Sequence, residues 1–299
     1  MKKKKSTIRE SYNDRILLIL IYFYLSVITL VVLYPLVYIV SASISSPEAV
    51  TAGQVWLWPV DFSLEGYKEV LNNSSVMRGF RNSILYTIGY TFIAVFLTII
   101  FAYPLSRKNF YGKKILMIFI LFTMLFYGGL IPEYLVVQRL GMLDTPWAIL
   151  IPKAIAVWQV IIARTFFQAS IPEELVEASE MDGCSSIKFL WHVVIPLSKP
   201  IIAVLALMYA VFQWNSYFDA MIFLRTEDLF PLQLELREIL ITQTQSGGNL
   251  DIAEQQRRQQ LANLMQYSLI VVSSIPVLII YPFAQKYFVK GMLLGSVKG

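Results

Sequence analysis

The chain has almost no residues suited to redox or metal chemistry. Its 299 residues include one cysteine, Cys184, and one histidine, His192. A structural zinc site needs four ligands, mostly cysteine and histidine, and a lone cysteine cannot form an intramolecular disulfide. The G-x-x-x-x-G-K-[ST] phosphate loop is also missing from the sequence, which argues against ATP binding by that route. We therefore expect no bound cofactor, no metal and no enzyme active site in this chain.

Charged residues are the second shortage. They make up 15% of the chain and hydrophobic residues 57%, against about 25% and roughly 45–50% in soluble domains. A run of about 20 apolar residues can cross a bilayer as a helix. The sequence contains six such runs, and the fourth is a weaker candidate because it contains the charged residues Lys153 and Arg164. The sequence predicts an all-α integral membrane protein with one transmembrane domain, 16–284. Its six predicted spans are 16–40, 83–105, 115–137, 147–167, 200–224 and 264–284.

The basic residues gather near the ends of these runs, which explains the net charge of +5 better than nucleic-acid binding does. Loops rich in lysine and arginine face the cytoplasm. The segments 1–15 and 106–114 and the tail 285–299 are basic, so both termini are predicted to be cytoplasmic. Counting crossings then places the loop 168–198 inside and the loop 225–263 outside. Arg78 and Arg81, just before the second run, go against this rule.

Ionisable groups deep in the membrane would indicate ion coupling. Asp219 lies about 28 Å along the fifth run at 1.5 Å per residue, close to the outer interface. Glu133 and Lys153 lie near outer ends, and Arg164 near an inner end. These positions favour interfacial charges over a proton or sodium pathway. Six spans without a visible energy source suggest a subunit that obtains energy from its partners.

The segment "SIPEELVEASEMDG" predicts a short helix on the cytoplasmic side. Ser170 and Glu173 have the spacing of a capping box, with Pro172 in the first turn. Gly183 suits a helix C-terminus. The predicted helix covers 171–182, and a second begins at Ser185 or Ser186 and runs to about Val194.

This helix–glycine–helix hairpin has a face of small residues beside an acidic flank. Ala178, Ser179 and Gly183 would let a partner approach closely, whereas a hairpin that merely joins two spans would need no such face. The hairpin is thus either a plain connector or a docking surface.

The run from Glu177 to Pro196 resembles the cytoplasmic coupling signature of ABC importer permeases, which reads E-A-A, three residues, G, nine residues, I-x-L-P. Conservative changes stand at Ser179, Val193 and Ile195. The stretches "GGLIPEYLVVQRLGMLDTPWAILIP", "WNSYFDAMIFL" and "FVKGMLLGSVKG" are similar to the six-helix, maltose-type member of the carbohydrate-uptake branch. The resemblance extends from about Ser83 to Gly299.

The resemblance implies a type I ABC importer permease fold in a bacterial inner or plasma membrane. Two permeases, two ATPases that hold ATP and Mg²⁺, and an external solute-binding protein would form the transporter. The 171–196 loop would sit in an ATPase cleft and drive alternating access. The implied coupling residues are Glu177, Ala178, Ser179, Asp182, Gly183 and Pro196. A carbohydrate, in particular an oligosaccharide, is the implied substrate; a non-sugar solute and an ion-coupled secondary transporter remain alternatives.

Aromatic and hydrogen-bonding residues gather near the end of the fifth run. Sugars are held by stacked aromatic rings and by amide or carboxylate groups, which makes this run the best candidate for lining a pathway. The same helical spacing also suits packing against a neighbouring helix. The candidates are Gln213, Trp214, Asn215, Tyr217 and Asp219.

Two external loops allow further predictions. Trp56 and Trp58 are expected to form a membrane-interface belt. The loop 225–263 is either simply solvated or a contact for the binding protein, with Gly247 and Gly248 at its tip.

Overall fold

The computed structural model describes residues 12–242 and 252–296, and these residues are helical, without a β-strand among them. The basic residues Lys2 to Lys5, the predicted loop tip at Gly247 and Gly248, and Lys298 lie outside the described residues. The chain divides into two compact units. Unit 1 comprises 1–70 and 247–272, and unit 2 comprises 71–246 and 273–299.

Unit 1 is built on the long apolar helix α1 (Tyr12–Ser43), followed by α2 (Pro47–Thr51) and most of α3 (Glu65–Asn72). The first part of α15 (Ile252–Ser296) completes the unit. The predicted span 16–40 is exposed along α1, whereas the helix end is buried. Ala42 packs there in a small core with residues of α2 and with Leu264. Unit 1 therefore leaves the apolar surface of α1 free for lipid or for another chain.

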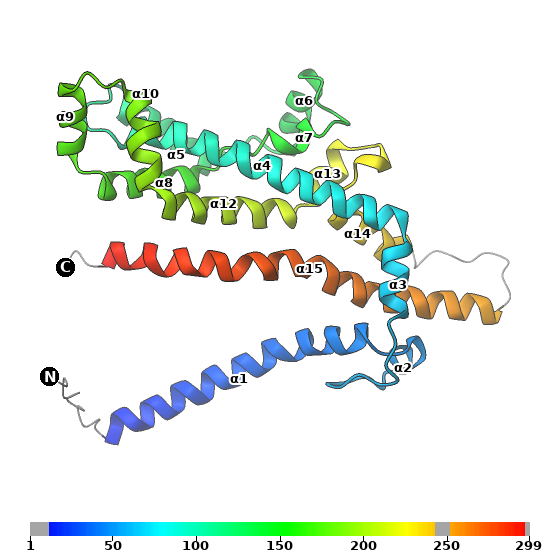
Figure 1. The fold of residues 1–299 in the computed structure, drawn as a ribbon. Helices are drawn as coiled ribbons and strands as arrows, with labels where there is room; N and C mark the ends of the chain where they lie inside the picture. Colours follow the sequence, from blue (N-terminus) through cyan, green and yellow to red (C-terminus); the bar gives the residue numbers. More distant parts are fainter. Residues whose placement is uncertain (1–11, 243–251, 297–299) are drawn as a thin grey trace. The chain divides into compact units, whose positions relative to one another are not determined.

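Unit 2 is organised around α4 (Ser74–Ser106), which packs against α12 (Lys199–Trp214), α8 (Val157–Ser170) and α14 (Leu232–Thr242). Figure 1 shows α4, α8 and α12 running side by side. One apolar core joins the C-terminal half of α4 to α8 and the start of α12. A second core, with Tyr90 and Tyr209 at its centre, joins the middle of α4 to α12 and α14. These two cores hold the elements that carry the predicted coupling and pathway residues.

Helix α4 contains the predicted second span but begins nine residues before it. Asn73 caps the helix, because its side chain accepts a hydrogen bond of 3.1 Å from the Val76 N–H. Arg78 and Arg81 therefore lie on the helix itself, and Arg78 pairs with Asp228 at 3.1 Å. An ion pair between the N-terminal part of α4 and the turn that contains Asp228 accommodates Arg78 where the charge rule did not expect it.

The predicted third span is divided in the structure. Its residues form α5 (Lys113–Leu125) and α6 (Leu130–Arg139), which meet at an angle of 115°. Gly129, between them, has a φ of +91°, a left-handed conformation that glycine adopts without steric cost. Two adjacent glycines, Gly128 and Gly129, thus interrupt an otherwise continuous apolar run.

The fourth and fifth predicted spans are also interrupted. Residues 147–167 form α7 (Trp147–Leu150) and α8, separated by a linker that contains Pro152. Residues 200–224 form α12 and the short α13 (Phe218–Phe223), and a 3₁₀ turn (Glu227–Leu229) precedes α14. By length and apolar composition, three described helices could each cross a membrane, or up to five spans if each sharply bent helix pair counts as one. The three are α1, α4 and the segment Gln259–Pro282 of α15.

Two glycines of α4 give a matched test of its packing. A Cβ at Gly79 would lie 3.2 Å from the backbone nitrogen of Leu232 and 3.0 Å from Glu235 Cγ, whereas a Cβ at Gly89 would lie 3.7 Å from Leu150. We expect Gly79→Ala to lower the free energy of unfolding by about 1–3 kcal/mol, the usual cost of overpacking. Gly89→Ala should be neutral or slightly stabilising, because alanine favours helix over glycine by about 1 kcal/mol.

Thermal unfolding of the two purified variants in detergent measures this difference. Equal melting temperatures for the two variants would contradict the close contact of α4 with α14.

Candidate functional site

The predicted coupling loop, 168–198, which is called the coupling loop below, contains α9 (Glu173–Met181), and this helix is shorter than predicted. The expected capping box is wrong: Ser170 ends α8, and Pro172 is the N-cap of α9 without a side-chain cap. The reason is Pro172 itself, which disfavours helical geometry in the residue before it. Ile171 is accordingly extended, with φ −116° and ψ 99°.

The C-terminus of α9 is a complete Schellman motif around Gly183, as its sequence position predicted. Gly183 has a φ of +69°. Its N–H donates to the Glu180 carbonyl at 3.0 Å, and the Cys184 N–H donates to the Ser179 carbonyl at 2.9 Å. The carbonyl groups of Glu180 and Ser179, which have no partner within the helix, thereby gain hydrogen bonds. The turn after α9 is therefore fixed by the backbone alone and leaves the side chains free.

The second half of the loop starts where the sequence placed it. Ser185 caps α10 (Ser186–Phe189) by accepting a hydrogen bond from the Lys188 N–H. A π-helical turn (Leu190–Val194) follows, closed by the Ile195 N–H bonding to the Leu190 carbonyl, and then α11 (Ile195–Leu197). Pro196 lacks the N–H that a regular helix would use here, which is a physical cause for the wider turn.

An angle of 83° separates the residues 186–197 from α12, with Ser198 at the corner. The loop is anchored by its apolar residues: Ile171, Phe189 and Val194 are buried against α4, α8 and α12. The loop therefore stands on an apolar core and continues directly into α12.

The predicted coupling residues lie together on the outside of this anchored loop. Glu177, Ala178, Asp182, Gly183 and Pro196 are exposed, and Ser179 is half-buried. Apolar side chains are exposed beside them, with Met181 at 89% and Ile187 at 72%. Exposed apolar side chains that lie together on one surface are a feature of protein-interaction sites.

The lone histidine and cysteine lie in the same loop. His192 Nδ1 is 3.0 Å from the Lys188 carbonyl, and Cys184 Sγ is 3.7 Å from the Ser185 carbonyl. The described residues contain no group of three or more metal-ligating side chains.

The predicted pathway residues divide into two groups. Gln213 and Trp214 are buried at the end of α12. The Trp214 indole N–H donates to the Ser273 carbonyl at 2.9 Å, and its ring meets Phe80 edge-on at 5.7 Å. In this conformation Trp214 is a packing residue that joins α12 to α15.

Asn215 and Tyr217 are exposed in the break between α12 and α13. Asn215 Nδ2 donates to the Val211 carbonyl at 2.8 Å, and the Tyr217 ring lies 5.9 Å from the Arg237 guanidinium. These two side chains are accessible to a solute, unlike their neighbours on α12.

Asp219 belongs to a charged cluster that its sequence position did not reveal. Asp219 Oδ1 lies 2.6 Å from Lys153 Nζ, and Glu133 Oε1 lies 4.0 Å from the same nitrogen. Tyr127 donates a hydrogen bond to Glu133, and Tyr90 donates one to the Lys153 carbonyl at 2.7 Å. The three charged side chains are partly buried, at 14–38% exposure.

Each interrupted span contributes one charge to this cluster. Glu133 is in the first turn of α6, Lys153 is in the linker between α7 and α8, and Asp219 is in the first turn of α13. A helix N-terminus stabilises a carboxylate through its dipole. The sequence offered a partial signal: Glu133 follows Gly128 and Gly129, and Lys153 follows Pro152, whereas neither glycine nor proline lies just before Asp219.

A second polar contact joins the loop before α7 to the turn after α13. The carboxylate of Asp144 accepts hydrogen bonds from the N–H groups of Arg225 and Thr226 at 2.8 and 2.9 Å, and from Thr226 Oγ1 at 2.7 Å. The Asp144 N–H donates to the Phe223 carbonyl at 2.8 Å. The hydrogen bonds from Thr226 and Arg225 lower the pKa of the Asp144 carboxyl below its usual value.

The lowered pKa gives a pH-dependent prediction. A depressed pKa in the folded state contributes stability above the unfolded pKa of about 3.9, and this stability is lost as the pH falls through the folded value. Asp144→Asn keeps the shape and tolerates the φ of +57°, but removes the charge. We expect the variant to melt below the wild type at pH 7 and the difference to shrink below about pH 4. Thermal unfolding at the two pH values tests this, and a constant difference would contradict it.

Comparisons with known proteins show the family of the chain. Residues 8–293 match the family described as "Binding-protein-dependent transport system inner membrane component". Protein LplC of Bacillus subtilis (strain 168) is 38% identical over 269 residues, which cover 90% of each chain. The polygalacturonan/rhamnogalacturonan transport system permease protein YtcP of the same organism is 39% identical over 288 residues, 96% of this chain and all of YtcP.

A solved structure extends the likeness to the fold. A chain in the crystal structure of a bacterial ABC transporter involved in the import of the acidic polysaccharide alginate aligns with a TM-score of 0.85 and 37% identity, over 93% of this chain and 99% of that one. This confirms the predicted all-α fold of a type I ABC importer permease. The chain therefore belongs to the family of binding-protein-dependent transport system inner membrane components, the ABC importer permeases that its coupling loop resembles.

Proposed function

We propose that the chain is one of two permease subunits in an ATP-driven importer of carbohydrates. The observation that carries this proposal is the exposed loop from Glu177 to Pro196, which stands on a buried apolar base and bends directly into α12. Two separate ATPase subunits, which bind ATP and Mg²⁺, would grip this loop. Their closure would move α12 and thereby switch the permease between inward- and outward-facing states.

The proposed topology has six spans with both termini in the cytoplasm of a bacterial cell. The bent pair α5–α6, helices α7–α8 and the pair α12–α13 then count as one span each, beside α1, α4 and α15. The basic segment 106–114 supports a cytoplasmic position for the coupling loop through the positive-inside rule. An external solute-binding protein would meet the opposite side, where this topology would place the loop 225–263.

The names of similar proteins support an acidic oligosaccharide as the substrate. YtcP is named for polygalacturonan and rhamnogalacturonan transport, and the aligned structure belongs to an alginate importer. Both names describe polymers that contain uronic acids. We propose that this chain takes part in importing short fragments of such a polymer.

Asn215, Tyr217 and Asp219 are proposed to line the external part of the pathway. Their support is exposure in the break after α12 and the charged cluster with Lys153. An ammonium group and two carboxylates can form hydrogen bonds with the hydroxyl groups of a sugar, and an aromatic ring can stack against its C–H face. Gln213 and Trp214 are buried in this conformation and would reach the pathway only after α12 moves.

The test begins with mild-detergent purification of the tagged protein from its native membrane, followed by mass spectrometry of the proteins that accompany it. The purified assembly is then placed in liposomes and supplied with binding protein. Uptake of oligogalacturonate is compared with uptake of a neutral maltodextrin.

We expect a second permease and an ATPase to co-purify. We also expect uptake of the acidic oligosaccharide to require ATP on the side of the liposome membrane where the ATPase subunits lie. Uptake that is abolished by an uncoupler but does not depend on ATP would favour an ion-coupled transporter. ATP-dependent uptake of neither saccharide would favour a non-sugar solute.

A further inference from the structure

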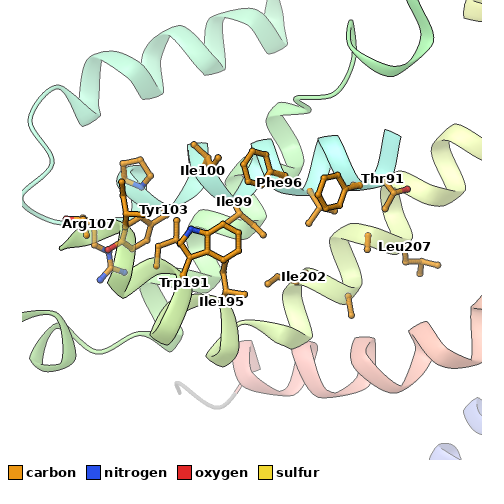
Figure 2. Close-up of a pocket in the computed structure, with 18 of the residues that line it drawn as sticks. Thr91, Phe96, Ile99, Ile100, Tyr103, Arg107, Trp191, Ile195, Ile202 and Leu207 are labelled. Atoms are coloured by element: carbon orange, nitrogen blue, oxygen red, sulfur yellow. The ribbon is translucent and has the colours of Figure 1, made fainter. Parts of the chain in front are cut away.

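Charged side chains are accommodated differently at the two ends of α4. Toward its C-terminus, α4 borders an apolar cavity of about 1320 Å³ together with α12, and Figure 2 shows Tyr103 and Arg107 at one end of this cavity. The guanidinium of Arg107 makes two hydrogen bonds, to Ser106 Oγ at 3.1 Å and to the Phe167 carbonyl at 3.5 Å. Toward its N-terminus, α4 packs against α14, and there a carboxyl group is buried without such bonds.

This carboxyl group belongs to Glu235, in the first turn of α14. The residue is only 6% exposed. Its Cγ lies against α4, 3.0 Å from the position that a Cβ on Gly79 would take. Within residues 12–242 and 252–296, the Glu235 carboxyl has neither a hydrogen bond nor an ion pair. Burying an ionised carboxyl without a partner is costly, and such a group takes up a proton instead.

The charged groups around Glu235 make its ionised form still less favourable. Glu238 follows it on α14, and the 3₁₀ turn before α14 contains Glu227 and Asp228. Arg78 of α4 is a basic group near Glu235, but its guanidinium is already paired with Asp228 at 3.1 Å. Burial, followed by the charges of Glu238 and Glu227, raises the pKa of the Glu235 carboxyl above its usual value, and Arg78 offsets only part of this effect.

The other charged residues on the elements that pack against α14 have different surroundings. The guanidinium of Arg237 lies over the Tyr217 ring at 5.9 Å. Asp219 of α13 is in the charged cluster with Lys153, and Arg81 of α4 is exposed. In the described part of the chain none of them pairs with the buried carboxyl, so proton binding is the remaining way to remove its charge.

The start of α14 is attached to α4 by groups that do not titrate near neutral pH. Ser83 Oγ accepts a hydrogen bond from the Leu232 N–H at 2.9 Å. The side-chain amide of Asn82 donates to the Phe230 carbonyl at 3.0 Å. Hydroxyl, amide and carbonyl groups keep these bonds whatever the pH. Glu235 lies about one turn beyond this attachment, so its charge acts on the part of α14 that follows.

We propose that Glu235 is a proton-dependent clasp between α14 and α4. With the carboxyl protonated, α14 packs on α4 as the structure shows. Ionisation makes this packing unfavourable, and residues 235–242 move away from α4 so that water reaches the carboxylate. The hydrogen bonds to Ser83 and Asn82 keep the start of the helix in place during this movement.

The direction of the pH dependence follows from the raised pKa of Glu235 in the packed form. The stability of the contact is fully present below the pKa of a free glutamate, about 4.3, and is lost as the pH rises through the packed-state value. The clasp is therefore tightest in acid. Under the proposed topology α14 belongs to the external loop 225–263 and responds to the acidity outside the cell; this placement, unlike the clasp itself, rests on the proposed function.

Hydrogen–deuterium exchange of the detergent-solubilised transporter, followed by mass spectrometry, tests the clasp. Exchange of the backbone amides of 235–242 is compared at pH 5 and pH 8, after correction for the intrinsic effect of pH on exchange. We expect the protection of this segment in the wild type to be lower at pH 8 by about fivefold or more, the lower end of the effect of a buried polar group without a partner.

Three variants separate Glu235 from other groups. Glu235→Gln keeps the shape of the side chain but cannot ionise, and its protection should be equal at the two pH values. Glu235→Met should behave in the same way if the glutamine amide is poorly tolerated in the buried position. Glu238→Gln removes a charge from the neighbouring exposed residue, and should move the loss of protection to lower pH without abolishing it, because burial is the larger cause.

Equal protection of the wild type at the two pH values would overturn the proposal. The same holds for a loss of protection at pH 8 that persists in both Glu235→Gln and Glu235→Met. Exchange in α14 requires neither saccharide nor ATP, so its outcome is independent of the uptake and co-purification experiments that test the proposed function.

Discussion

Gly183→Arg is expected to detach the ATPase subunits from the permease. Gly183 is exposed, has a φ of +69°, and a Cβ added to it would meet no atom within 4 Å. The first atom of a new side chain is therefore accommodated without a clash, although the left-handed backbone costs about 1–2 kcal/mol. A large cation in the centre of a docking surface should cost at least as much as losing a hot-spot residue, about 2 kcal/mol, or roughly 30-fold in affinity.

Gly112→Arg is the matched control for this prediction. Gly112 also has a positive φ, +83°, and free space around its Cβ, but it lies in the loop 106–114 and outside the coupling loop. The amount of ATPase that co-purifies with each tagged variant is the measurement, and Glu177→Lys should behave as Gly183→Arg does. If Gly112→Arg loses the ATPase to the same degree, backbone strain and not docking explains the effect.

Lys153→Met is expected to destabilise the protein strongly and to impair uptake. Without the ammonium group, the carboxylates of Asp219 and Glu133 face one another without compensation. Breaking a fully buried ion pair costs about 3–5 kcal/mol; because these side chains are 14–38% exposed, we expect about 1–3 kcal/mol. Thermal unfolding in detergent provides the measurement.

The double variant Lys153→Met with Asp219→Asn should be more stable than Lys153→Met alone, since it removes the uncompensated charge together with its partner. Asp228→Asn serves as a control on the exposed pair with Arg78, where the Asp228 side chain is 74% exposed, and should cost less than about 1 kcal/mol. Lys153→Met, Asp219→Asn and the double variant form a double-mutant cycle. If the two single changes lower the free energy of unfolding additively, the ion pair contributes little to stability.

Local signals predicted the coupling loop well. Gly183 and Ser185 determine their turns through their own backbone and side-chain bonds, so their positions in the sequence sufficed. The capping box at Ser170 failed because two local rules competed, and the restriction imposed by Pro172 on Ile171 prevailed. Where a capping-box pattern and a proline predict different helix starts, the backbone restriction imposed by the proline is therefore the better guide.

Apolar composition predicted where the long hydrophobic segments lie but not where they bend. Gly128 and Gly129 mark the break between α5 and α6, and Pro152 marks the one between α7 and α8. The break at Asn215 to Tyr217 contains neither glycine nor proline. Trp214, just before that break, is held by a hydrogen bond to the Ser273 carbonyl and by an edge-on contact with Phe80, and a single sequence does not specify such contacts.

The charged cluster could not be predicted for a different reason. Lys153 and Asp219 are 66 positions apart, and each looked like an ordinary interfacial charge by itself. Their pairing depends on how three interrupted spans meet, which hydrophobic periodicity does not specify. The residues of the cluster were visible in the sequence, and only their proximity was missing.

The π-helical turn between the coupling loop and α12 has an evolutionary consequence. Such a turn holds one residue more than an α-helical turn, so the extra residue is taken up inside the turn and the flanking residues keep their directions. The segment between Leu190 and Val194 is therefore a place where a lineage of permeases could gain or lose one residue without turning α9 relative to α12.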